Sequence, residues 1–109
     1  MDRVGDEIIV LITTSNRDEA SKIGTALVEG HLAACVNIMP EVRSLFYWEG
    51  KLQDDREILL ICKSRLPYMT EIVARVKSLH SYAVPEVIAL PIVAGSGEYL
   101  DWMRSATKG

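Results

Sequence analysis

The sequence predicts a single α+β domain, residues 1–109, in which a four-stranded antiparallel sheet carries two helices on one face. Apolar runs rich in β-branched residues alternate with segments of helical periodicity, in the order strand, helix, strand, strand, helix, strand. The chain has 109 residues, which is enough for one hydrophobic core but not for a second.

The first strand and the first helix are expected close to the N-terminus. The segment Glu7–Thr14 (EIIVLITT) is bounded by turn-forming residues on both sides, as is typical of a buried strand. Asn16, with Glu19 three residues later, resembles a helix N-cap, and apolar residues then recur at helical spacing. Gly30 ends this pattern, so the helix is expected to stop there.

A long hairpin is expected next. Ala33–Trp48 has the composition of an extended strand, and Pro40, which has no N–H to donate, predicts a bulge or an edge position. Glu49-Gly50 should form the turn, and Lys51–Ser64 should return from a polar tip into the core. A strand of about 14 residues spans roughly 46 Å, whereas a compact domain of this size measures roughly 34 Å, so the hairpin should overhang.

A second helix is expected from about Pro67 to Leu79, because its apolar residues follow a three-four spacing. The order of elements to this point, followed by one more strand, is that of the split βαβ or ferredoxin-like sandwich. In that arrangement both helices lie on one face of the sheet. The other face is therefore expected to be uncovered in an isolated chain.

The C-terminal part predicts a short strand and a third helix. Val87–Leu90 is an apolar run ended by Pro91, and Ile92–Ala94 is a candidate edge strand. Ser96 can then cap a last helix that continues through Met103.

The segment Ser44–Gly50 (SLFYWEG) contains three adjacent aromatic residues. Because successive strand residues point to opposite faces, Tyr47 should point away from the side that takes Phe46 and Trp48. An overhanging hairpin with these residues at its tip would be an aggregation hazard alone. We therefore expect a closed homo-oligomer that covers the tip and the bare sheet face.

Composition excludes several classes of protein. The net charge is −3 and no run of Lys and Arg is present, which argues against a nucleic-acid partner. No apolar stretch has the length of a membrane span or of a signal peptide, so we expect a cytoplasmic protein with no membrane partner. Cys35 and Cys62 each lie inside an apolar segment, as expected for free thiols in a reducing compartment.

Several segments, in this order, resemble the CutA family of divalent-cation-tolerance proteins: Leu32–Ile38, Ser44–Gly50, Glu57–Lys63, His80–Pro91 and Tyr99–Trp102. The resemblance covers nearly the whole chain. It implies a cytoplasmic homotrimer of ferredoxin-like subunits, built by pairing sheet edges as in the PII signalling proteins. It also implies a role in tolerance of copper and other divalent metals.

The resemblance also suggests metal ligands. Some members are described as binding copper through a cysteine on the first strand and a histidine before the last strand. His80 matches that histidine, but Ile12 stands at the position of the cysteine. Cys35 matches another family cysteine, and a thiolate with an imidazole suits copper. We therefore take His80 and Cys35 as candidate ligands of copper or another divalent metal, with no obligatory cofactor. A third ligand would come from a neighbouring subunit.

Two further hypotheses remain open. The chain could be a trimeric PII-like signalling or ligand-sensing module that binds a small anionic ligand between subunits. The residues proposed for that cleft or for the subunit interface are Trp48, Glu57, Lys63, Tyr82 and Glu86. The other hypothesis is an enzyme with Cys35 as nucleophile and His80 as base. No residue at a recognisable spacing would orient that pair, so we expect no enzymatic activity.

Some candidates also have a purely structural explanation. His80 lies at the end of the second predicted helix, where the helix dipole favours an imidazolium. Lys63 ends an apolar strand and can extend its amine to the surface. Trp48 and Trp102 are expected to pack at the subunit interface rather than to stack on a ligand.

Overall fold

The computed structural model describes residues 5–108, so residues 1–4 and residue 109 lie outside the described residues. The main elements are β1 (Glu7–Thr14), α1 (Arg17–Glu29), β2 (Cys35–Trp48), β3 (Lys51–Arg65), α2 (Met69–Leu79), β4 (Val87–Pro91) and α3 (Gly97–Ala106). A 3₁₀ turn, Leu66–Tyr68, with Pro67 in its first turn, leads into α2. Every predicted helix and main strand is present, with ends that differ by a few residues.

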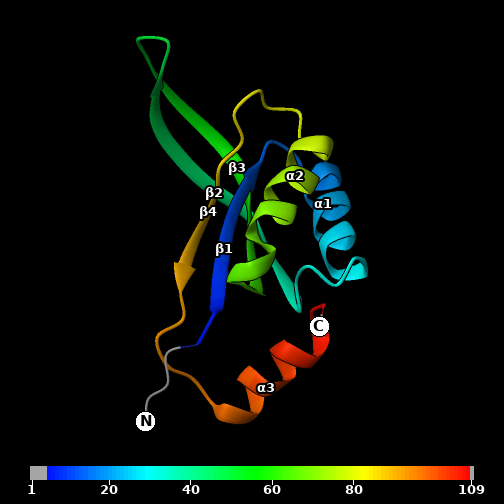
Figure 1. The fold of residues 1–109 in the computed structure, drawn as a ribbon. Helices are drawn as coiled ribbons and strands as arrows, with labels where there is room; N and C mark the ends of the chain where they lie inside the picture. The colour runs from blue at the N-terminus through cyan, green and yellow to red at the C-terminus, as the bar shows by residue number, and fades with distance from the viewer. Residues whose placement is uncertain (1–4, 109) are drawn as a thin grey trace.

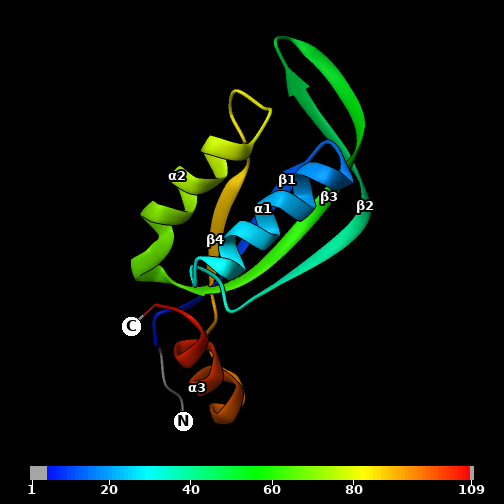
Figure 2. The ribbon, with the colours of Figure 1, turned by 90° about the vertical axis from the view of Figure 1, so that its right-hand side faces the viewer.

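The four strands form one antiparallel sheet in the order β2-β3-β1-β4. The central strand β1 pairs with β3 on one side, from Glu7 opposite Arg65 to Thr14 opposite Ile58. Figures 1 and 2 show α1 and α2 side by side on one face of this sheet. The predicted α+β architecture is confirmed in these respects.

The hydrophobic core lies between that sheet face and the two helices. Alternate residues of the strands point into it, and Ile12 and Leu60, which are paired across β1 and β3, are fully buried there. At Gly24 of α1 an added Cβ would lie 3.3 Å from Cγ1 of Val36 on β2. The missing side chain therefore lets α1 approach the sheet closely. The side chain of Ile12 lies inside this core and not on the open face.

The opposite face of the sheet carries apolar side chains that neither α1 nor α2 covers. These are the intervening residues of each strand, namely Ile9, Leu11, Leu59, Ile61, Ile88 and Leu90. Ile88 and Leu90 of β4 are half exposed. This is the uncovered face that the sequence predicts.

The hairpin of β2 and β3 extends beyond the rest of the fold, as predicted. The strand β1 ends at Thr14 opposite Ile58, whereas β2 and β3 continue to pair as far as Trp48 opposite Lys51. The register shifts between Met39 and Val42, which is the irregularity expected around Pro40. The longest dimension of the chain is 45 Å, and the free hairpin is plain in both views (Figures 1 and 2).

The hairpin turn consists of Glu49 and Gly50, with φ angles of 51° and 78°. Two successive positive φ values are characteristic of the tight turn that matches the twist of paired strands. The predicted turn is thus confirmed, and Gly50 supplies the second left-handed position at no steric cost.

The C-terminal region differs from the prediction in one respect. The segment Ile92–Ala94 is not a strand. The N–H of Ile92 donates to the carbonyl of Glu7 at 3.1 Å, and since β1 begins at Glu7 there is no further strand residue to pair with. The expected cap of α3 is present, because Ser96 Oγ accepts a hydrogen bond from the N–H of Tyr99.

The helix α3 packs at the end of the sheet remote from the hairpin tip (Figure 1). Leu100 and Met103 are buried against Ala34. Nε of Arg104 donates to the buried carboxylate of Glu7 at 2.8 Å. Within residues 5–108, no helix has the length and apolar character needed to cross a membrane.

Candidate functional site

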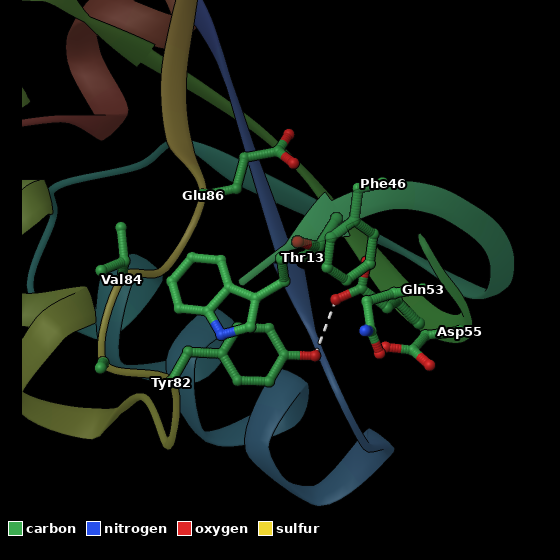
Figure 3. A pocket seen from close by; sticks show the side chains of 10 residues that line it. Thr13, Phe46, Gln53, Asp55, Tyr82, Val84 and Glu86 are labelled. Carbon is green, nitrogen blue, oxygen red and sulfur yellow. Dashed lines mark hydrogen bonds between the residues drawn. The ribbon is translucent and has the colours of Figure 1, made fainter. Parts of the chain in front are cut away.

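A pocket of about 510 Å³ lies between the base of the hairpin and the loop that joins α2 to β4. Figure 3 shows Phe46, Gln53 and Asp55 from the hairpin facing Tyr82, Val84 and Glu86 from the loop. The remaining lining residues are Thr13, Trp48, Glu57 and Ala83.

The alternation of the strands explains which hairpin residues reach the pocket. Phe46 pairs with Gln53 across the hairpin, and Trp48 pairs with Lys51. Residues two apart on a strand share a face, so Phe46 and Trp48 both line the pocket. The intervening Tyr47 does not line it and is 75% exposed. The prediction that Tyr47 points away from its two aromatic neighbours is confirmed.

One hydrogen bond crosses the pocket floor from the loop to the hairpin. The hydroxyl of Tyr82 donates to Oε2 of Glu57 at 2.7 Å (the dashed line in Figure 3), and Glu57 is only 6% exposed. Desolvation, and then the hydrogen bond to Glu57, raises the pKa of the Tyr82 hydroxyl well above its ordinary value. The hydroxyl therefore stays protonated and remains a donor.

The lining is acidic. Asp55, Glu57 and Glu86 contribute carboxylates, and the described residues of the lining include no Lys, Arg or His. Burial, and secondarily the charge of Glu57, raises the pKa of the Glu86 carboxyl. The pocket of this chain therefore favours a cation over the anionic ligand that the sequence analysis considered.

His80 lies behind the loop rather than in the pocket lining, and its side chain is fully buried. Its Nε2–H donates to the carbonyl of Thr13 at 2.7 Å, and its Nδ1 accepts from the N–H of Tyr82 at 3.0 Å. Oε2 of Glu19 lies 3.3 Å from Nδ1. Both ring nitrogens are engaged within the chain, so a metal could bind His80 only by displacing one of these partners.

Cys35 and Lys63 lie together at the other end of the sheet. They are opposite each other on β2 and β3, and the Lys63 amine donates to Oδ1 of Asn37. Cys35 is partly exposed, and its position places it on the uncovered sheet face. Lys63 is therefore separate from the pocket, whereas the other four predicted cleft residues line it.

Cys35 and His80 do not meet within one chain. Lys63, opposite Cys35, pairs with Ile9 of β1, whereas His80 bonds to Thr13 on the same strand. Four residues along a strand span about 13 Å, and Cys35 lies two strands away from β1 as well. No cluster of three or more His, Cys, Asp or Glu side chains suited to a metal ion occurs in the described part of the chain.

Sequence reasoning missed several residues of this region. Gln53 and Asp55 could have been found, because both share the strand face of Glu57, at alternate positions of β3. No sequence pattern connects Glu19 with this region, because its position in the sequence indicates only the first turn of a helix. Its Oε1 also accepts from the N–H of Ser81 at 3.1 Å, which holds the start of the loop against α1.

Comparison with known proteins agrees with this structure. The model of the family described as CutA1 divalent ion tolerance protein matches residues 8–106. The chain is 48% identical over 101 residues to the divalent-cation tolerance protein CutA of Thermus thermophilus, covering 93% of this chain and 98% of that protein. It is 46% identical over 101 residues to the chloroplastic protein CutA of Arabidopsis thaliana, covering 93% of this chain but only 56% of that protein.

Solved structures are similar over nearly the whole chain. The divalent cation tolerance protein of Thermus thermophilus superimposes with a TM-score of 0.91 at 47% identity, covering 94% of this chain and 99% of that chain. CutA1 from Oryza sativa superimposes with a TM-score of 0.92 at 41% identity, covering 96% of each chain. The chain therefore belongs to the CutA1 divalent ion tolerance protein family.

Proposed function

We propose that this chain acts in divalent-cation tolerance as a homotrimer that binds a metal, with copper as the leading candidate, through ligands from more than one subunit. The observation that carries the proposal is the pair of unpartnered surfaces in a chain of this family: the overhanging hairpin and the uncovered sheet face.

The fold supports an assembled state. The strand order β2-β3-β1-β4, with α1 and α2 on one face, is consistent with the ferredoxin-like arrangement, whose second face is free to pack on a neighbour. Beyond Val42 and Glu57 no third strand of the described residues pairs with the hairpin, and the exposed apolar side chains there include Leu45 and Leu52. Pairing of these edges between copies would cover both surfaces and close the oligomer.

The chemistry of the two thiols favours Cys35 as a metal ligand. Burial raises the pKa of the Cys62 thiol to about 12, so this thiol is not available as a thiolate. Cys35 is partly exposed on the sheet face that a neighbouring subunit would cover. A soft thiolate suits Cu(I), and the further ligands would come from the neighbouring chains.

A binding role fits the geometry better than catalysis. The proposed nucleophile Cys35 and the proposed base His80 lie at different ends of the sheet, and His80 already bonds to two backbone groups. Both cysteines are free, which suits a reducing compartment such as the cytoplasm.

The test is a competition titration of the reduced protein with Cu(I) and, separately, Cu(II), repeated on Cys35→Ser. Stoichiometric Cu(I) binding that Cys35→Ser abolishes is the expected result. Thr25→Ser, a substitution on the outer surface of α1, serves as the control and should bind as the parent does. Weak binding that is equal in all three proteins would refute the proposed role of Cys35.

A further inference from the structure

A groove of about 780 Å³ runs between α1 and α2 on the outer side of the two helices. Ala26, Leu32 and Leu79, which are buried or partly buried, form its floor, and exposed charged residues of both helices form its rims. The hairpin and the uncovered sheet face contribute none of the described lining residues. The groove therefore stays open in the assembly proposed above, and its volume is typical of small-molecule sites.

The two helices run antiparallel along the groove. Figure 2 shows the start of α1 beside the end of α2, where a hydrogen bond holds the following loop to Glu19. At the opposite end, the N–H of Lys108 donates to the carbonyl of His31, just after α1. Lys22 therefore lies toward the first end, and Glu29, about 10 Å further along α1, lies toward the second.

Two cations of the groove, Lys22 on α1 and Arg75 on α2, form no ion pair within residues 5–108. The carboxylate one turn before Arg75 is Glu71, at a spacing that favours an ion pair on a helix. Oε2 of Glu71 instead lies 3.3 Å from Nζ of Lys108. Positive charge without a partner among the described residues is therefore present on both rims.

An anion placed between the rims would interact with both cations. The guanidinium of Arg75 can bind a carboxylate or a phosphate through two parallel hydrogen bonds, and the ammonium of Lys22 adds a further charged donor. Ser21 also lines the groove and offers a hydroxyl donor. Ala26 and Leu79 provide apolar surface for the body of such a ligand.

We propose that the groove between α1 and α2 binds a small organic dianion, either a dicarboxylate or a phosphate monoester, through Arg75 and Lys22. Two negative charges match the two cations that lack a partner. The carboxylates Glu29 and Glu71 lie toward the other end, so the anion is held at the end of Lys22. The site is separate from the acidic pocket beside the hairpin, and the proposal does not depend on metal binding.

Isothermal titration calorimetry of the assembled protein tests this proposal. Low ionic strength is used, because salt screens interactions between exposed charges. The titrants are succinate, phenyl phosphate and succinamide, the uncharged counterpart of succinate. We expect saturable binding of succinate or phenyl phosphate and none of succinamide. The dianion that binds more tightly identifies which of the two classes the site takes.

Three variants locate the binding energy. Arg75→Gln should weaken the affinity by about tenfold or more, because the paired hydrogen bonds to the anion are lost. Lys22→Gln should weaken it several-fold. Lys77→Gln is the matched control, since Lys77 is an exposed cation of α2 that is not among the lining residues. Its substitution should change the affinity by less than about twofold.

Absence of saturable binding of both dianions at millimolar concentration would overturn the proposal. An equal loss of affinity in Lys77→Gln and Arg75→Gln would also do so, because it would indicate attraction by overall charge. The amide chemical shifts of Ala26 and Gly30, which line the groove, should change on saturation. Changes confined to the hairpin would contradict the proposed location. None of these readouts involves copper, so they are independent of the metal titration.

Discussion

The hydroxyl of Tyr82 donates a 2.7 Å hydrogen bond to Oε2 of Glu57, and this bond fastens the loop after α2 to the base of the hairpin. Glu57 is buried, so losing its donor leaves a desolvated carboxylate oxygen without that partner. Two segments separated by 25 residues are thereby held as the walls of one pocket.

Tyr82→Phe should lower the free energy of unfolding by about 1–3 kcal/mol, because it removes a donor to a buried carboxylate. Urea unfolding followed by circular dichroism measures this change. Tyr47→Phe is the matched control, since Tyr47 is exposed and lies outside the pocket, and it should change the free energy by less than about 0.5 kcal/mol. Equal effects of the two substitutions would show that the Tyr82–Glu57 bond contributes nothing.

Glu86→Gln should raise stability slightly at neutral pH. The folded state raises the pKa of Glu86 above its ordinary value of 4.5, chiefly by burial, so the ionised form is the less favourable one in the fold. The stability that the protonated carboxyl contributes is fully present below the unfolded pKa and is lost as the pH rises through the folded pKa.

The difference between Glu86→Gln and the parent should therefore be present at pH 7 and disappear below about pH 4.5. Because the burial of Glu86 is only partial and the residue keeps much of its surface in water, we expect a gain well under ~1 kcal/mol. Urea midpoints of both proteins at pH 7 and pH 4 provide the test. A difference that grows as the pH falls would have the wrong sign.

Trp48→Ala should weaken assembly more than it disturbs the fold of one chain. Trp48 lies on the overhanging hairpin and is half exposed within one chain, outside the main core. Sedimentation velocity should show dissociation at concentrations at which the parent is assembled, with circular dichroism nearly unchanged. Val28→Ala, a truncation on the outer face of α1, is the control and should leave the oligomer intact. An unchanged oligomer in Trp48→Ala would contradict the proposed interface.

Cys62 should resist alkylation in the native protein. It is fully buried, and burial raises the pKa of its thiol to about 12, so little thiolate is present at neutral pH. Iodoacetamide treatment of Cys35→Ser, in which Cys62 is the only thiol, followed by mass spectrometry, should show modification only after denaturation. Rapid native labelling would mean that the core opens readily around β3.

Much of this arrangement follows from strand periodicity. Alternation alone places Phe46 and Trp48 on one face and Tyr47 on the other, and the length of the paired segments predicts the overhang. Strand geometry also explains why Lys63 lies apart from the pocket. It shares the strand face of Glu57, but it lies six residues along β3, about 20 Å away.

Other features depend on partners that a sequence does not identify. His80 lies at the end of α2, where the sequence predicts a helix end. The partners of its two ring nitrogens, the carbonyl of Thr13 and the N–H of Tyr82, are brought to it only by the folded chain. The run Ile92–Ala94 has the composition of a strand, yet β1 provides no residue beyond Glu7 for it to pair with. A segment with high β-propensity forms a strand only where another strand is available to pair with it.

The most direct test of the proposed function is size-exclusion chromatography of the Cu(I)-loaded, reduced protein, with light scattering for mass and copper measured in each fraction. We predict that copper elutes with a species of three chain masses and is absent from any single-chain fraction. Copper that elutes with single chains, or a trimer that carries none, would contradict a metal site built from more than one subunit.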